Sequence, residues 1–95
     1  MKIKDGFVIR KLQDEYYIVS VGSATKILNG TIQIDKVNAF VFDKIKESNN
    51  IDTICNLVLE KFKKENNEEL TIEEVKKNSL KFIENLRQLG ILVDD

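Results

Sequence analysis

Residues 29–42, with the sequence NGTIQIDKVNAFVF, contain the point at which this chain changes from strands to helices. Asn29-Gly30 is a strong turn signal, and Thr31–Ile34 after it is predicted to form a short strand. Asp35 is a good N-cap for a helix, and it follows the strand directly. Apolar residues then recur at helical spacing, at Val37, Phe40, Val41 and Ile45. This stretch therefore predicts a strand joined directly to a helix.

The residues before this stretch predict two more strands. Phe7–Leu12 is rich in β-branched and aromatic residues, and residues 16–21 are richer still. The short polar segment at residues 13–15 between them is typical of a hairpin. Gly22-Ser23-Ala24 then ends the second strand. Three strands joined by short connections predict an antiparallel meander.

The residues after this stretch predict two more helices. Asp52 is expected to cap one whose buried face includes Ile54, Val58 and Phe62, and which ends in the polar run at residues 63–69. Thr71 and Glu74 form a capping box for the other. The apolar stripe expected on this last helix consists of Ile72, Val75, Ser79, Phe82, Leu86 and Leu89. Gly90 then occupies the position of a left-handed C-terminal residue. The chain is thus predicted to be one α+β domain over residues 1–95, with a three-stranded antiparallel sheet followed by a three-helix bundle.

Composition argues against most catalytic functions. The 95 residues contain 15 Lys and Arg, 16 Asp and Glu, no His and one Cys, and the net charge is −1. The absence of His removes the commonest general base and metal ligand, and a single cysteine cannot form a disulfide within the chain. A near-neutral charge disfavours a general nucleic-acid binder. The N-terminal residues do not resemble a signal peptide, and no apolar run is long enough to span a membrane. We therefore expect a cytoplasmic binding protein with no enzymatic activity and no cofactor.

Three groups of residues suggest chemistry at first sight. Cys55 lies beside the apolar face of the second helix, and without His to act as a base it is interpreted as a buried structural residue. Gly22 and Gly30 are interpreted as turn residues, since neither belongs to a phosphate-binding motif. The acidic residues near the start of the third helix complement its dipole, so that a metal site is not expected there; they are Glu68, Glu69, Glu73 and Glu74.

The predicted strand Thr31–Ile34 has an unprotected edge. It contains no Lys, no Pro and no inward-facing charge, which are the usual features that block edge pairing. Extended peptides bind at such edges by adding a strand. The edge is therefore either a docking site for a partner or a site of unwanted pairing with other chains.

Residues 21–42 resemble the PqqD family, with a small-residue turn, the Asn-Gly turn, a short strand and then a helix. Residues 82–92, FIENLRQLGIL, resemble the last helix of that family and its Leu-x-x-x-Gly-hydrophobic exit. The similarity covers residues 5–93, and it rests on the order and spacing of these motifs.

The resemblance implies a small winged-helix-like domain, also called a RiPP recognition element. Such domains bind the leader segment of a ribosomally made precursor peptide in natural-product biosynthesis. They act as peptide chaperones and present the precursor to a modifying enzyme, often a radical S-adenosylmethionine protein. The leader adds as a strand beside the third strand and lies against the third helix. The residues that the resemblance assigns to peptide binding here are Thr31, Ile32, Gln33, Ile34, Asn78, Lys81, Phe82, Asn85, Leu86 and Leu89.

Two other functions remain possible at this stage. A winged-helix DNA-binding protein predicts a basic recognition helix, whereas residues 71–89 carry a net charge of only +1, from four basic and three acidic residues. A self-pairing structural protein would use the open strand edge to form an edge-paired or domain-swapped homodimer. An enzyme is disfavoured, because no set of residues supplies a nucleophile, a base and an orienting group.

Overall fold

The computed structural model describes residues 1–28, 30–66 and 70–94, without the side chains of residues 64–66. Its elements, in chain order, are β1 (Lys2–Ile3), β2 (Phe7–Leu12), β3 (Glu15–Ser20), the 3-10 helix η1 (Gly22–Lys26), β4 (Thr31–Ile34), α1 (Lys36–Glu47), α2 (Ile51–Asn66), α3 (Ile72–Gln88) and β5 (Leu92–Val93). The predicted α+β fold, three antiparallel strands followed by three helices, is confirmed. The short strands β1 and β5 and the 3-10 helix η1 are additions to that prediction.

Strands β2, β3 and β4 form one antiparallel sheet in this order, so that β3 is central and β4 lies at an edge. The hairpin between β2 and β3 has a two-residue turn, Gln13-Asp14, with φ of 50° and 68°. Two positive φ values in succession define the tight turn that matches the twist of a hairpin. The second strand therefore begins at Glu15, one residue earlier than predicted.

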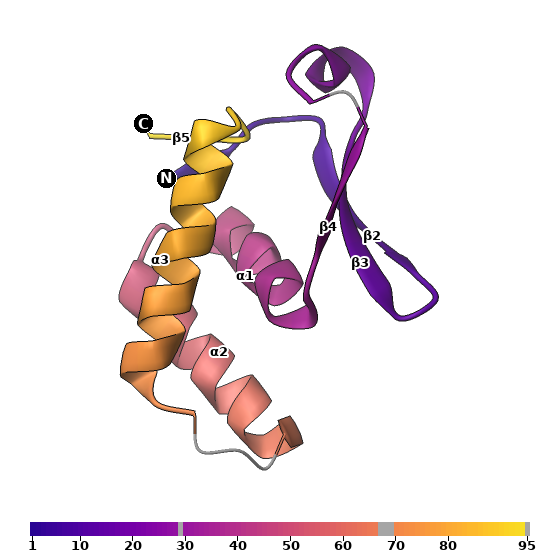
Figure 1. The fold of residues 1–95 in the computed structure, drawn as a ribbon. Helices are drawn as coiled ribbons and strands as arrows, with labels where there is room; N and C mark the ends of the chain where they lie inside the picture. The colour runs from indigo at the N-terminus through magenta and orange to yellow at the C-terminus, as the bar shows by residue number, and fades with distance from the viewer. Residues whose placement is uncertain (29, 67–69, 95) are drawn as a thin grey trace.

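The helices cover one face of the sheet (Figure 1). The register places Ile9, Ile18 and Ile32 side by side on the same face, and Ile18 is fully buried there. Phe42 and Val41 of α1 are also fully buried. Because side chains alternate along a strand, the opposite face carries Tyr17, whose hydroxyl donates a hydrogen bond to Glu15. The core thus lies between the sheet and the helices.

Two of the three predicted helix caps are confirmed. The Asp35 carboxylate accepts a hydrogen bond from the backbone N–H of Asn38, at 2.7 Å, and Thr71 Oγ1 accepts one from the N–H of Glu74. The cap predicted at Asp52 is wrong. The Asn50 side chain accepts from the N–H of Thr53 instead, and α2 begins at Ile51. Asn and Asp cap helices equally well, so that spacing alone did not distinguish them.

The apolar stripe predicted for α3 is correct in its middle and wrong at its ends. Val75, Ser79, Phe82 and Leu86 are buried, whereas Ile72 and Leu89 are 40% and 45% exposed. Ile72 is the first residue of the helix, and Leu89 lies just beyond its last turn. The residues at the two ends of the stripe therefore lie outside the core and are partly exposed to solvent.

The chain termini meet at one side of the molecule (Figure 1), where β1 and β5 pair antiparallel. Gly90, with φ of +79°, reverses the chain after α3 as predicted, and Ile91 accepts a hydrogen bond from the N–H of Lys4. Ile91 and Leu92 are buried in the core. Within the described residues, the helices are too short or too polar to cross a membrane.

Candidate functional site: a groove between β4 and α3

The pairing pattern determines which backbone groups of β4 face outward. In a hairpin with a two-residue turn, the closing pair Leu12–Glu15 exchanges both backbone hydrogen bonds. Odd-numbered residues of β3 therefore bond to β2, in agreement with the hydrogen bond from the N–H of Val21 to the Gly6 carbonyl, at 2.7 Å. Even-numbered residues of β3 bond to β4.

It follows that Ile32 and Ile34 use their N–H and C=O groups to pair with β3, because they lie opposite Ile18 and Tyr16. The N–H and C=O groups of Thr31 and Gln33 then point to the outer side of β4. Successive side chains of β4 point to opposite faces of the sheet, and those of Ile32 and Ile34 lie on the same face as the buried Ile18. The outer side of β4 thus offers two N–H and two C=O groups beside an apolar face.

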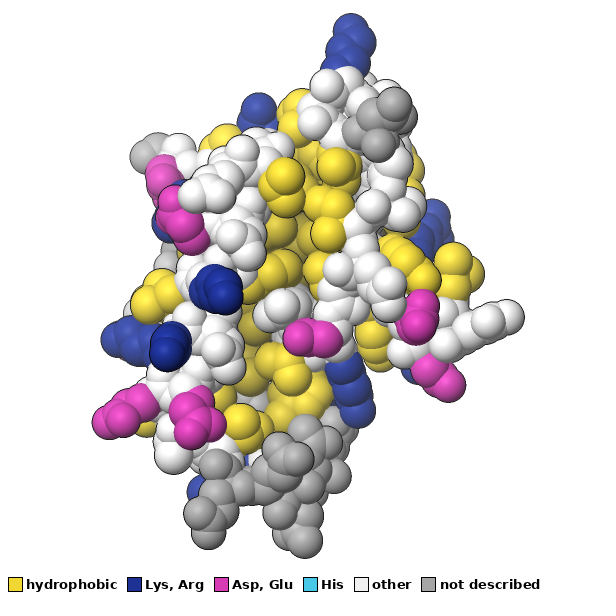
Figure 2. Space-filling model, in the orientation of Figure 1, with side chains coloured by type: hydrophobic (Ala, Val, Ile, Leu, Met, Phe, Trp, Pro, Cys, Tyr) yellow, Lys and Arg dark blue, Asp and Glu magenta, His cyan; other side chains and the backbone are white. Residues whose placement is uncertain are grey.

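A groove of about 540 Å³ lies between β4 and α3, within the range of small-ligand sites. We call it the strand–helix groove, and its lining consists of Ile18, Ile32, Gln33, Ile34, Asp35, Asn38, Phe82, Asn85, Leu86, Gln88 and Leu89. Figure 2 shows hydrophobic side chains gathered in a band along the hollow between these two elements. The groove therefore has an apolar floor next to the open side of β4.

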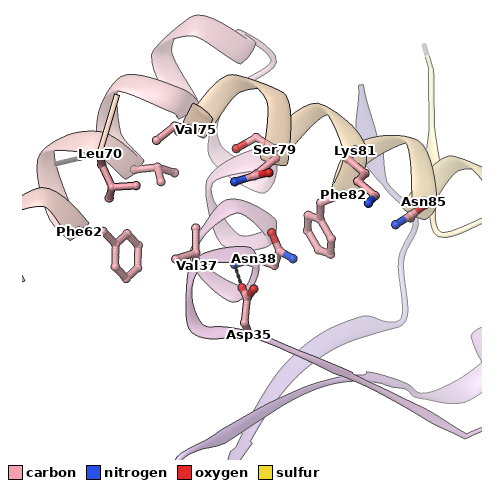
Figure 3. A pocket seen from close by; sticks show the side chains of 12 residues that line it. Asp35, Val37, Asn38, Phe62, Leu70, Val75, Ser79, Lys81, Phe82 and Asn85 are labelled. Atoms are coloured by element: carbon pink, nitrogen blue, oxygen red, sulfur yellow. Dashed lines mark hydrogen bonds between the residues drawn. The ribbon is translucent and has the colours of Figure 1, made fainter. Parts of the chain in front are cut away.

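A second hollow of about 460 Å³, the three-helix hollow, continues from the groove. Its lining consists of Asp35, Val37, Asn38, Val58, Phe62, Leu70, Val75, Asn78, Ser79, Lys81, Phe82 and Asn85. Four of these residues also line the strand–helix groove: Asp35, Asn38, Phe82 and Asn85. In Figure 3, the side chains of Phe82, Asn38 and Val37 point into this space from α3 and α1. The two hollows form one continuous depression along α3.

The structure brings most of the residues assigned from the sequence to this depression. Seven of the ten line the strand–helix groove: Ile32, Gln33, Ile34, Phe82, Asn85, Leu86 and Leu89. Asn78 and Lys81 line the three-helix hollow, and Thr31 lines neither, although its backbone faces outward. The sequence interpretation missed Asn38, Gln88 and Asp35. Asn38 lies one helical turn beyond the Asp35 cap, and this spacing was the available signal for it.

Comparison with known proteins identifies one similar fold. No protein-family model matches the chain, and no curated protein is significantly similar to it in sequence. The structure titled TbiB1 in complex with the TbiA(beta) leader peptide superimposes with a TM-score of 0.71 over 100% of both chains, at 16% identity. The two proteins share a fold. The TbiB1 structure thus shows this architecture in a complex with a leader peptide.

Cys55 is buried, as predicted. It is 1% exposed on α2, and the equally buried Ser79 faces it from α3. Burial raises the pKa of the Cys55 thiol, and the neighbouring Ser79 hydroxyl only partly offsets this effect. A thiol with a raised pKa is a poor nucleophile at neutral pH. The described residues contain no group of three potential metal ligands, and Glu68 and Glu69 lie outside these residues.

The raised pKa of Cys55 predicts a loss of stability at alkaline pH. Above the ordinary thiol value of 9.0, the unfolded chain loses its thiol proton while the folded protein keeps it. The free energy of unfolding should therefore fall as the pH rises from about 9 to the folded-state pKa, by at most about 1.4 kcal/mol per pH unit. Urea unfolding of reduced protein between pH 8 and 11 measures this.

The control for this prediction is Cys55→Ala, which removes the thiol and leaves every other ionisable group in place. The difference in stability between the wild type and this variant isolates the thiol. We expect the difference to change with pH above about 9. A constant difference would show that the thiol does not contribute.

Proposed function

We propose that this protein binds the leader segment of a ribosomally synthesised precursor peptide and has a PqqD-like role as a RiPP recognition element. The leader adds as a strand to the outer side of β4 and lies in the strand–helix groove. The protein then presents the precursor to a modifying enzyme of the radical S-adenosylmethionine class. The observation that carries the proposal is the outward direction of the backbone groups of Thr31 and Gln33, beside an apolar groove. The shared fold of TbiB1, whose structure contains a leader peptide, supports it.

Strand addition predicts a simple pattern in the peptide. Peptide residues opposite Ile32 and Ile34 place their side chains on the same face as these two isoleucines, over the groove floor. The residue between them points to the opposite face of the sheet. We therefore expect two apolar residues at positions i and i+2 of the bound segment. Phe82 and Leu86 of α3 supply the facing apolar surface.

The energetics require these apolar contacts. Four backbone hydrogen bonds contribute about 0.5–1.5 kcal/mol each, and ordering a disordered segment costs about 2–5 kcal/mol. Hydrogen bonds alone therefore give weak binding. Burial of roughly 200 Å² of apolar surface adds about 5 kcal/mol at 25 cal/mol per Å². Micromolar or tighter affinity then depends on the two side chains that enter the groove.

The alternative of DNA binding has less support. The net charge of +1 on α3 is partly neutralised, because Lys76 pairs with Asp52 at 3.3 Å and Arg87 pairs with Glu84 and Asp94. A DNA-binding helix instead presents its cations to phosphates. Self-pairing through β4 uses the same backbone groups as peptide binding, so that it is a competing outcome of the experiment below.

The experiment is an NMR titration with leader segments from the precursor genes that neighbour this one. We expect shift changes at Thr31–Ile34 and along residues 78–89. Amide exchange adds a sharper criterion, because the N–H groups of Ile32 and Ile34 already bond to β3. The peptide should slow exchange at Thr31 and Gln33, while Ile32 and Ile34 exchange slowly in its absence.

Three results would contradict the proposal. Shifts confined to β2 would place the peptide at the other sheet edge. A monomeric protein that responds to none of these leaders at millimolar concentration would exclude leader binding. A molecular mass that doubles with concentration, together with slow exchange at Thr31 and Gln33 in the absence of peptide, would favour the self-paired form.

A further inference from the structure

A peptide strand in the groove has two edges, and only one of them pairs with β4. Successive residues of an extended chain direct their N–H and C=O groups to opposite sides. If one set pairs with Thr31 and Gln33, the alternate set points toward α3. Where α3 shields this edge from water, its backbone groups need partners on the helix, because buried groups without partners cost free energy. This inference rests on the proposed function.

The wall that α3 contributes carries carboxamide side chains. Asn85 lines both hollows, Asn78 lines the three-helix hollow and Gln88 lines the strand–helix groove. Lys81 is the one charged α3 residue in these linings. The remaining charged residues of the helix lie outside both of them: Glu73, Glu74, Lys76, Lys77, Glu84 and Arg87. The side of α3 that lines these two hollows therefore carries three carboxamides and a single charged side chain, that of Lys81.

These carboxamides are available to a ligand. Among the described residues, the side chains of Asn78, Asn85 and Gln88 make no hydrogen bond. Asn78 and Asn85 are seven residues apart, which is about 10.5 Å along a helix and matches about three residues of an extended chain. A carboxamide both donates and accepts, and this suits it to a backbone edge that alternates N–H and C=O.

We propose that Asn85, with Asn78 and Gln88 beside it, hydrogen-bonds the main chain of the bound peptide along the edge turned away from β4. The peptide backbone is then held from both sides, by β4 and by α3. Because main-chain contacts are independent of side-chain identity, the carboxamides provide affinity without selecting a sequence. Selectivity comes from the apolar side chains that enter the groove floor.

The test combines protein variants with backbone-modified peptides. The probe is the leader segment that binds most tightly in the titration above, prepared with single ester replacements that each remove one N–H group. Asn85→Leu removes the carboxamide, Asn85→Gln retains it, and Asn56→Leu is the matched control on an exposed part of α2 outside both hollows. Affinities for all pairs form double-mutant cycles.

We expect Asn85→Leu to weaken binding roughly 2- to 10-fold, Asn85→Gln to recover part of this loss and Asn56→Leu to have no effect. Esters at alternate peptide positions should fall into two classes. One class loses its effect in Asn85→Leu. The other class keeps its full effect in that variant, because its N–H groups bond to backbone carbonyl groups of β4. This alternation is the signature of a backbone held from both sides.

The outcomes separate this inference from the proposed function. If esters at alternate positions weaken binding but none of them couples to Asn85→Leu, strand addition stands and the role of the carboxamides is excluded. If the wild type binds no leader at all, the proposed function fails and this inference fails with it. Equal losses in Asn85→Leu and Asn56→Leu would also overturn the inference.

Discussion

Replacing Gln33 with proline should lower the affinity for the leader at least tenfold and leave the domain folded. The N–H of Gln33 points to the outer side of β4, so that proline removes a donor to the peptide without removing a bond to β3. The ring also occupies the space into which the added strand must move. One lost hydrogen bond accounts for a factor of roughly 2 to 10, and the steric block adds to it. Isothermal titration calorimetry with the leader measures the change.

Two variants control for this prediction. Gln33→Ala removes the side chain but keeps the N–H, and it should bind within about threefold of the wild type, since most of the binding energy comes from backbone and apolar contacts. Lys11→Pro introduces a proline on the outer side of β2, at the opposite edge of the same sheet. This variant should bind the leader with the affinity of the wild type. Unchanged affinity in a folded Gln33→Pro protein would exclude strand addition at β4.

Replacing Gly6 with alanine should destabilise the domain by about 3–5 kcal/mol, the sum of backbone strain and overpacking. Gly6 has φ of +93°, a conformation that other residues rarely adopt. A Cβ atom there would lie 2.6 Å from the Ala24 Cβ and 2.8 Å from the Val21 carbonyl oxygen. Neither atom belongs to a flexible side-chain end, so that the contact of Gly6 with Val21 and Ala24 must open. Thermal and urea unfolding measure the loss.

The matched control is Gly22→Ala. Gly22 also has a positive φ, of +62°, but a Cβ there meets no atom within 4 Å. Its substitution should therefore cost only the conformational strain, about 1–2 kcal/mol. The difference between the two variants isolates the packing contribution at Gly6. Equal losses would show that the close approach to Ala24 does not constrain the fold.

Several features of the fold could be predicted because they depend on neighbouring residues. The Asp35 and Thr71 caps each use a hydrogen bond that spans three residues, and the left-handed Gly90 follows from its position after a helix. The Asp52 cap was wrong for the same reason, since Asn50 competes with it locally. Pairing of β1 with β5 joins the two ends of the chain, and no local signal in two-residue strands indicates it.

The candidate site could be predicted only in part. The resemblance assigned β4 and α3 to the site, and the structure places a groove between them. Asn38 and Gln88 were missed because their position in the groove depends on how α1 and α3 pack. Leu89 was expected in the apolar stripe of α3 but is 45% exposed. Helical spacing gives the angle of a residue around its own helix. It does not give the distance to another element.

By itself, the sequence determined the order and type of the three main strands and the three helices, but not β1, β5 or η1. Local hydrogen bonds and the spacing of apolar residues are sufficient for these features. Only the tertiary structure decided which groups of β4 face outward, because this direction depends on the register from the β2–β3 hairpin through β3. It also decided that α3 stands far enough from β4 to leave a groove, since this separation results from the packing of segments distant in sequence.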